Sequence, residues 1–389
     1  MHYLSLLLLG TLWLAGCKAA DPVAPTKPGP PLPPSVTTPT ARLITEPVVY
    51  VGSYDGKLYA IDTTTGLPRW TFKADTSIQS SPTVAYGLVY TTSLGGLIYA
   101  LDGATGTMRW QVKTRGQIQS SPVVAAGRLF VGSQDGRLYA LDATTGGYLW
   151  TFKIAKGFYG SPLVADGLVY IGGLDNSVYA FDVATGLLRW RFTANEYFIS
   201  SPAVAGGVLY IGSQDSNLYA LDARTGTQIW TWTVPFMGGI DASPVVAQGL
   251  VYLGSGAGPN PKLYALDASR GQLVWSFTAK SSFYGSSVVA GGVLYVGCRD
   301  KNLYALNASD GTVRWSAPTD YDIYSTPAVS NGSVYIGSTD ERLYAFNART
   351  GRKRWEYRTK GLLISSPALA QPSAVIGAYP TISGNKSSQ

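Results

Sequence analysis

The residues that most often carry chemistry are scarce in this chain. Among 389 residues it has one histidine, His2, and two cysteines, Cys17 and Cys298. Zinc sites and nucleophile–histidine–acid triads depend on histidines or clustered cysteines, so the chain has almost nothing from which to build them. The 23 acidic residues could still pair for acid–base catalysis, but most recur at turn positions. The sequence therefore predicts no catalytic residues, no metal site and no enzyme activity.

Cys17 stands where a different chemistry is expected. It ends the sequence LAGC at residues 14–17, which follows an apolar run too short to span a bilayer. This stretch resembles the bacterial lipobox, whose cysteine is acylated. We expect a lipoprotein signal peptide at residues 1–16 and lipidation at Cys17, and Lys18 favours the outer membrane. The segment before the apolar run lacks Lys and Arg, so a secretory peptide with a chance cysteine, or a different start codon, stays open.

A proline-rich segment separates this cysteine from the rest of the chain. Eight prolines lie between Asp21 and Thr40. Such a composition favours extended polyproline II structure, so we interpret residues 17–44 as a tether. The last residues, 372–389, are rich in Ser and Gly and are expected to form a flexible tail.

The elements that must position any site come from a long repeat. Tryptophan recurs every 40 residues, with one interval of 45. A unit of this length that contains only strands is one sheet per repeat, and such a sheet buries its faces by stacking on its neighbours. The repeated tryptophans are Trp70, Trp110, Trp150, Trp190, Trp230, Trp275, Trp315 and Trp355.

Each unit contains four short apolar runs. In the third unit they predict strands A, B, C and D near residues 121–125, 129–133, 138–142 and 148–153. Asp135-Gly136 between B and C predicts a type I′ hairpin turn, in which both central residues take positive φ. No segment shows sustained helical periodicity, so we expect an all-β chain.

The repeats are out of phase with the ends of the chain. The first unit starts at its B strand, residues 48–53, and the last A strand, near residues 364–370, has no B, C and D after it. A ring in which the last strand completes the first sheet removes two open sheet edges. We expect a monomeric, eight-bladed β-propeller of four-stranded antiparallel blades over residues 45–371, closed by the C-terminal strand joining the first blade.

The stretch Ala60-x-Asp62-x-x-Thr65-Gly66-x-x-x-Trp70 is repeated around the chain. It resembles the tryptophan-docking signature of the pyrroloquinoline quinone (PQQ) repeat family. The resemblance implies that each tryptophan packs between blades, that the Asp accepts hydrogen bonds from the turn backbone, and that the Gly takes a positive φ. Dehydrogenases with these repeats carry a vicinal Cys-Cys disulfide, a calcium site and an Asp base. None of these is visible here, so no cofactor is expected and PQQ is disfavoured.

Variation between the repeats is concentrated on one face of the predicted disc. The D-to-A and B-to-C connections share this face, and the A-to-B and C-to-D turns share the other. We interpret the variable face as an aromatic-lined mouth that docks a partner. Alternatively, the first apolar residue of each loop pair, such as Phe158, Phe198 or Phe283, packs between blades. The candidate face residues are Tyr159, Tyr197, Phe236, Asp241, Tyr284, Tyr321 and Tyr324.

The net charge of +7 gives a mildly basic chain. Many of its arginines directly precede a repeat tryptophan, so we expect a solvated rim that discourages association between sheets, with an anionic-lipid or nucleic-acid surface as the alternative. No nucleic-acid partner is predicted. Cys298 stands where other repeats have serine, and we expect a buried filler rather than a reactive thiol.

A lipid-anchored ring of eight such repeats resembles the BamB family of envelope lipoproteins. The resemblance implies a non-catalytic scaffold or adaptor at the outer membrane that faces the periplasm. Its partners would be envelope proteins, such as an outer-membrane barrel assembly complex. In a host without an outer membrane, the equivalent place is the extracytoplasmic membrane surface. Two alternatives stay open, a periplasmic receptor for a small ligand or glycan and a PQQ-dependent dehydrogenase-like protein.

Overall fold

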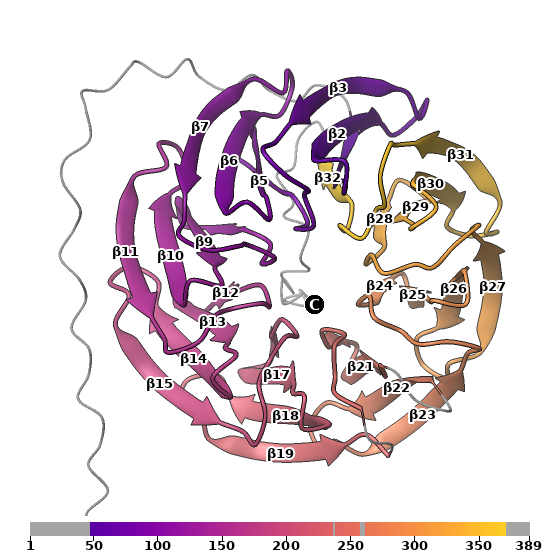
Figure 1. The fold of residues 1–389 in the computed structure, drawn as a ribbon. Coiled ribbons are helices and arrows are strands. Elements are labelled where there is room, and N and C mark those ends of the chain that lie inside the picture. The colour runs from indigo at the N-terminus through magenta and orange to yellow at the C-terminus, as the bar shows by residue number, and fades with distance from the viewer. Residues whose placement is uncertain (1–46, 236–237, 257–260, 371–389) are drawn as a thin grey trace, which may run out of the picture.

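The computed structural model describes residues 47–235, 238–256 and 261–370. In these ranges 32 strands form eight four-stranded antiparallel sheets, which surround a central axis as blades (Figure 1). The predicted all-β, eight-bladed propeller is therefore confirmed. The predictions for Cys17, the signal peptide, the tether, Phe236 and the tail fall outside the described residues. None of the described segments is a helix of the length and apolarity needed to cross a membrane.

Each blade runs from an inner strand A to an outer strand D, and blade 1 consists of β32, β1, β2 and β3. The A strands are β4 (Thr83–Ala85), β8 (Val123–Ala125), β12 (Leu163–Ala165), β16 (Ala203–Ala205), β20 (Val245–Ala247), β24 (Val288–Ala290), β28 (Ala328–Ser330) and β32 (Ala368–Ala370). The B strands are β1 (Val48–Gly52), β5 (Leu88–Thr92), β9 (Arg128–Gly132), β13 (Leu168–Gly172), β17 (Val208–Gly212), β21 (Leu250–Gly254), β25 (Val293–Gly297) and β29 (Ser333–Gly337). The C strands are β2 (Lys57–Asp62), β6 (Leu97–Asp102), β10 (Arg137–Asp142), β14 (Ser177–Asp182), β18 (Asn217–Asp222), β22 (Lys262–Asp267), β26 (Asn302–Asn307) and β30 (Arg342–Asn347). The D strands are β3 (Pro68–Lys73), β7 (Met108–Lys113), β11 (Tyr148–Lys153), β15 (Leu188–Thr193), β19 (Gln228–Thr233), β23 (Leu273–Thr278), β27 (Val313–Pro318) and β31 (Lys353–Arg358).

The ring closes through its own ends. β32 pairs antiparallel with β1, with Ala370 opposite Val48. Trp355 in the last blade donates its indole N–H to the carbonyl oxygen of Thr63 in the first blade at 2.9 Å. The predicted closure, in which the C-terminal strand completes the first blade, is confirmed. The pairing leaves β1 without an unpaired edge and gives blade 1 the same four strands as the other blades.

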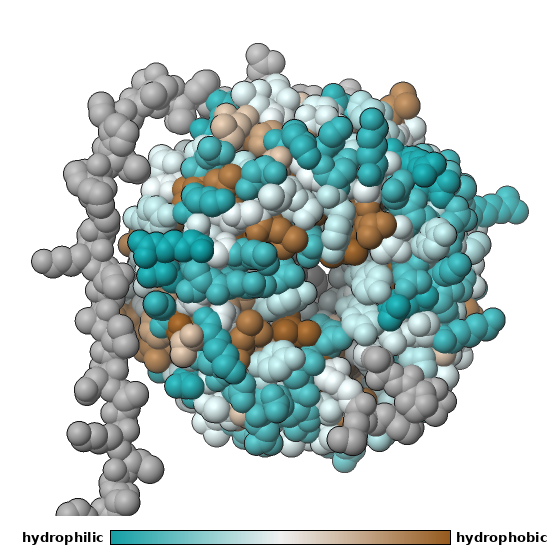
Figure 2. Space-filling view, in the orientation of Figure 1, coloured by the Kyte–Doolittle hydropathy of each residue, from teal (hydrophilic) through white to brown (hydrophobic). Residues whose placement is uncertain are grey.

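The B and C strands form the core, because their side chains are buried on both faces between neighbouring blades. The buried side chains form eight clusters, and each cluster draws on two adjacent blades. On the face that Figure 2 presents, hydrophobic residues form small groups set among hydrophilic ones. Apolar packing between blades is thus the main source of stability.

A repeated clamp joins each blade to the next. In blade 2, Tyr90 and Trp110 both donate to the carbonyl oxygen of Ala143 in blade 3, at 3.0 and 3.1 Å. All eight repeat tryptophans donate in this way to the C–D turn of the following blade. Each indole also lies on the turn glycine, where an added Cβ would come within 2.5–2.8 Å of it. The glycine of the repeat therefore provides room for the indole as well as a positive φ.

The turn predicted at Asp135-Gly136 is not of type I′. Gly136 has φ of 86°, but Asp135 is not among the residues with positive φ. The Asp135 carboxylate instead accepts hydrogen bonds from the backbone N–H of Arg137 and from the hydroxyl of Tyr139, which favours a longer turn with one left-handed residue. Paired positive φ values occur in the A–B turns, such as the one at Ala126 and Gly127.

Candidate functional site

The loops of the variable face are held by a repeated hydrogen-bond unit. Tyr139 in β10 donates its hydroxyl to Asp135 in the B–C turn at 2.5 Å, and the same carboxylate accepts the backbone N–H of Arg115 from the preceding D–A loop at 3.0 Å. Equivalent amide bonds at 2.9–3.3 Å reach Asp215, Asp300 and Asp340. Each such aspartate ties a D–A loop to the next blade, so the loop side chains project from an ordered base.

The strongest cluster on this face lies at blades 7 and 8. The rings of Tyr284 and Tyr324 have centroids 5.6 Å apart. The Arg299 guanidinium lies 5.5 and 5.4 Å from these two centroids, and its Nε donates to Asp322 at 2.9 Å. The hydrogen bond that Arg299 donates to Asp322 raises the pKa of Arg299, and burial raises the pKa of Tyr324. These four side chains form one cation–π assembly, which we call the tyrosine–arginine cluster.

A second group approaches the axis from other blades. Tyr159 is 40 % exposed, and its hydroxyl accepts a hydrogen bond from Gln119 at 3.4 Å. Burial raises the pKa of Tyr159, and the electrostatic influence of Tyr54 and Asp241 raises it further. Tyr54 also raises the pKa of Tyr324, so Tyr54 lies within electrostatic range of both rings. Side chains from blades 1, 4, 6 and 8 are thus electrostatically coupled on this face.

Asp241 is a partly buried carboxylate in this group. Burial raises its pKa above the usual range, and the amide of Gln214 opposes the rise by donating at 2.8 Å. A carboxylate in such a setting holds its charge less readily than an exposed one.

The remaining predicted residues lie apart from the tyrosine–arginine cluster or beneath the surface. Tyr321 is 59 % exposed, with the ammonium group of Lys301 at 5.1 Å from its ring. Tyr197 is 38 % exposed, and its carbonyl oxygen accepts the backbone N–H of Gln214. The phenylalanines that could have faced the partner are fully buried between blades. These are Phe158, Phe198 and Phe283.

Below the mouth, the A strands line an axial channel. Residues with hydroxyl side chains just before these strands are linked around the axis. A backbone N–H of one blade donates to the hydroxyl oxygen of the next at 2.8–3.1 Å. Seven such bonds join the described residues, at Ser81, Ser121, Ser161, Ser201, Ser243, Ser286, Thr326 and Ser366. Serine, proline, alanine and valine side chains enclose an axial cavity of about 180 Å³.

The sequence did not single out Tyr54, Gln214, Arg299 or Lys301. Tyr54, Gln214 and Arg299 occupy one repeat position, directly after the Ser or Cys that follows strand B. This position differs from blade to blade, and that variation was a usable signal. Cys298 beside it is fully buried, and burial raises its thiol pKa to about 12.

The fold and the docked tryptophans define a class of protein, the eight-bladed propellers built from PQQ-type repeats. Within this class the chain belongs to the family described as outer membrane protein assembly factor BamB, which it matches over residues 12–123, 94–259 and 259–379. No curated protein sequence matches the chain.

Solved structures agree with this fold. The structure of BamB from Moraxella catarrhalis is 20% identical, with a TM-score of 0.64 over 74% of this chain and 90% of that chain. A quinohemoprotein alcohol dehydrogenase from Comamonas testosteroni is 18% identical, with a TM-score of 0.65 over 81% of this chain and 74% of that chain. The computationally designed Ika8 protein is 16% identical, with a TM-score of 0.64 over 74% and 90%. At these identities the likeness concerns the fold alone.

Proposed function

We propose that this chain is a non-catalytic scaffold of the cell envelope that binds a protein partner through the mouth formed by its D–A loops and B–C turns. The observation that carries the proposal is the tyrosine–arginine cluster. Tyrosine and arginine dominate the binding energy of many protein interfaces. Here Asp322 and two rings hold Arg299 in place before any partner arrives, which lowers the entropy lost on binding. Family membership supports a partner from outer membrane protein assembly.

The test compares the double variant Tyr284→Ala/Tyr324→Ala with Tyr148→Ala. Tyr148 is 49 % exposed on the outer strand β11 and serves as the matched control. Crosslinking mass spectrometry from the native membrane identifies the partner, and a detergent pull-down measures its yield. Loss of two hot-spot residues lowers the affinity about thirtyfold or more, from a cost of about 2 kcal/mol or more. An unchanged yield relative to Tyr148→Ala would refute the role of the mouth.

The proposal assigns the chain no quinone chemistry, although alcohol dehydrogenases share its fold. Calcium binds six to eight oxygen ligands, with carboxylates prominent among them. The axial cavity is lined by hydroxyls, prolines and aliphatic side chains, and no carboxylate is among its lining residues. The carboxylates at the mouth are already engaged, Asp241 with Gln214 and Asp322 with Arg299. These residues do not suit a calcium-bound quinone. Quinone absorbance, or dye-linked alcohol oxidation after addition of PQQ and calcium, would overturn this part.

A second candidate function is a receptor for a small ligand or glycan, which the hydroxyl-lined axial cavity favours. Its volume of about 180 Å³ lies below the range of about 300–1,000 Å³ typical of ligand pockets, so the scaffold function is preferred. A saturable, ligand-dependent rise in melting temperature that persists in the mouth variant Tyr284→Ala/Tyr324→Ala would reverse this preference.

The scaffold function implies a place at the outer membrane facing the periplasm, with Cys17 as the lipid anchor and residues 17–44 as the tether. The lipobox-like residues 14–17 support this assignment. Replacing Cys17 by serine should move the protein from the membrane fraction to the soluble periplasmic fraction and abolish incorporation of labelled fatty acid. Retention of the Cys17→Ser variant in the membrane would refute a lipid anchor at this residue.

A further inference from the structure

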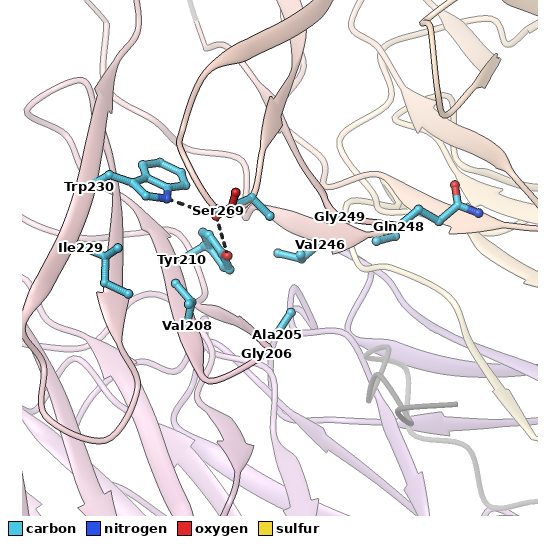
Figure 3. A pocket seen from close by; sticks show the side chains of 12 residues that line it. Ala205, Gly206, Val208, Tyr210, Ile229, Trp230, Val246, Gln248, Gly249 and Ser269 are labelled. Carbon is cyan, nitrogen blue, oxygen red and sulfur yellow. Dashed lines mark hydrogen bonds between the residues drawn. The ribbon is translucent and has the colours of Figure 1, made fainter. Parts of the chain in front are cut away.

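A groove opens on the face opposite the mouth, between blades 5 and 6 (Figure 3). Its volume is about 380 Å³, and the A–B turns of both blades border it. Its walls are mostly apolar and include Ile229, Trp230 and Val246. The polar atoms of Trp230 and Tyr210 are turned to the carbonyl oxygen of Ala268, to which they donate at 3.1 and 2.9 Å. The groove therefore offers an apolar surface of a size that binds small groups.

At the equivalent junction between blades 2 and 3, a tyrosine side chain bridges the two A–B turns. There Tyr86 from the A–B turn reaches across to the next blade, and its hydroxyl oxygen accepts the backbone N–H of Gly127 at 3.0 Å. In the repeat, Gly206 is the counterpart of Tyr86, and Gly249 is the counterpart of Gly127. The backbone is the same at both turns, with φ of 54° at Tyr86 and 57° at Gly206. Blade 5 therefore keeps the docking geometry but lacks the side chain.

A second replacement makes the same groove more apolar. In blade 2, Arg109 precedes the tryptophan and pairs with Asp102 at 2.6 Å. Its counterpart in blade 5 is Ile229, which is 50 % exposed. Among the described A–B turns, only that of blade 5 combines glycine at its first left-handed position with an aliphatic residue directly before the blade's tryptophan. Blade 7 has the glycine, Gly291, but keeps an arginine, Arg314. Two independent changes thus expose one apolar groove.

We propose that this groove binds a tyrosine side chain of a partner protein. The ring lies against Ile229, Val246 and Trp230, and the phenol oxygen accepts the backbone N–H of Gly249, as Tyr86 accepts that of Gly127. Rigid aromatic side chains are effective anchors in such grooves. The site lies on the face opposite the mouth, so it would give the scaffold a second docking point that does not depend on the first.

The probe for the test is N-acetyl-L-tyrosinamide, with N-acetyl-L-phenylalaninamide as the comparison. Titration of the ¹⁵N-labelled protein should move the Gly249 amide resonance saturably with the tyrosine probe, and the phenylalanine probe should move it much less. The blocking variant is Gly206→Tyr, which restores the side chain found in blade 2. Gly291→Tyr is the matched control, because both glycines have nearly the same φ and neither has an atom within 4 Å of an added Cβ.

We expect Gly206→Tyr to weaken probe binding at least tenfold and Gly291→Tyr to leave it unchanged. Equal affinity in the two variants, no saturable shift in the unaltered protein, or equal shifts with both probes would overturn the proposal. Tyr379 belongs to the C-terminal residues outside the described ranges. A gain of probe binding in Tyr379→Ala would also overturn the proposal, because the groove would then bind a tyrosine of the chain itself. Intact partner binding at the mouth in Gly206→Tyr would separate this result from the fate of the proposed function.

Discussion

Replacing Gly226 by alanine tests the contact that joins blades 4 and 5. Gly226 has φ of 74°, and a Cβ placed on it would lie 2.6 Å from Cε3 of Trp190. The left-handed backbone costs alanine about 1–2 kcal/mol. Overpacking against the indole costs about 1–3 kcal/mol more, because Trp190 is also held by its bond to Ala223 at 2.9 Å. We therefore expect a loss of about 2–5 kcal/mol in the free energy of unfolding.

Gly167→Ala is the matched control for this change. Gly167 has φ of 78°, and no atom lies within 4 Å of an added Cβ. It therefore reports the backbone cost alone, about 1–2 kcal/mol. Equilibrium unfolding in urea with an unchanged m value measures both losses. Equal losses for Gly226→Ala and Gly167→Ala would show that the indole contact has no part in the requirement for glycine.

Three further outcomes follow from the same structure. Burial raises the pKa of Asp62, but the hydrogen bonds from Arg69 and two turn amides outweigh it and lower the pKa to about 2. The stabilisation from these bonds is complete above pH 3.8, the usual pKa, and is lost as the pH falls toward 2. Between these pH values the melting temperature should fall more steeply in the unaltered protein than in Asp62→Asn. Trp355→Phe removes the bond to Thr63 that spans the closure and should cost about 1 kcal/mol or more in urea unfolding, whereas no loss would contradict the clamp. Cys298, with its thiol pKa raised to about 12, should resist alkylation in the native protein and react on unfolding, which mass spectrometry of its peptide detects.

The ring and its closure could be predicted because they depend on the repeat itself. The interval between tryptophans sets the size of a blade, and the phase of the repeats at the two ends requires a shared first blade. The B–C turn could not be predicted as reliably. Asp135 looked like the first residue of a tight turn, yet its carboxylate also bonds the backbone of Arg115 in the preceding loop. That contact exists only after two blades have come together, so a dipeptide pattern does not contain it.

The candidate site shows the same limit. Tyr284 and Tyr324 stood out because their loops differ from the other repeats. Arg299 lies in a B–C turn between them in sequence, and its place between the two rings depends on how neighbouring blades meet. Gly206 was overlooked for another reason. Glycine is expected in any tight turn, so a missing side chain gives no signal until Tyr86 is seen at the equivalent junction.

The pairing of β32 with β1 means that the first blade is completed only after the rest of the chain has been synthesised. Synthesis runs from the N-terminus, so seven blades can assemble while the sheet begun by β1 still waits for its inner strand. During that interval its free edge can recruit strands from other chains. The residues synthesised last thus protect the sheet begun by the residues synthesised first from aggregation. A chain truncated before Ala368–Ala370 would leave β1, in the first blade, with an unpaired edge.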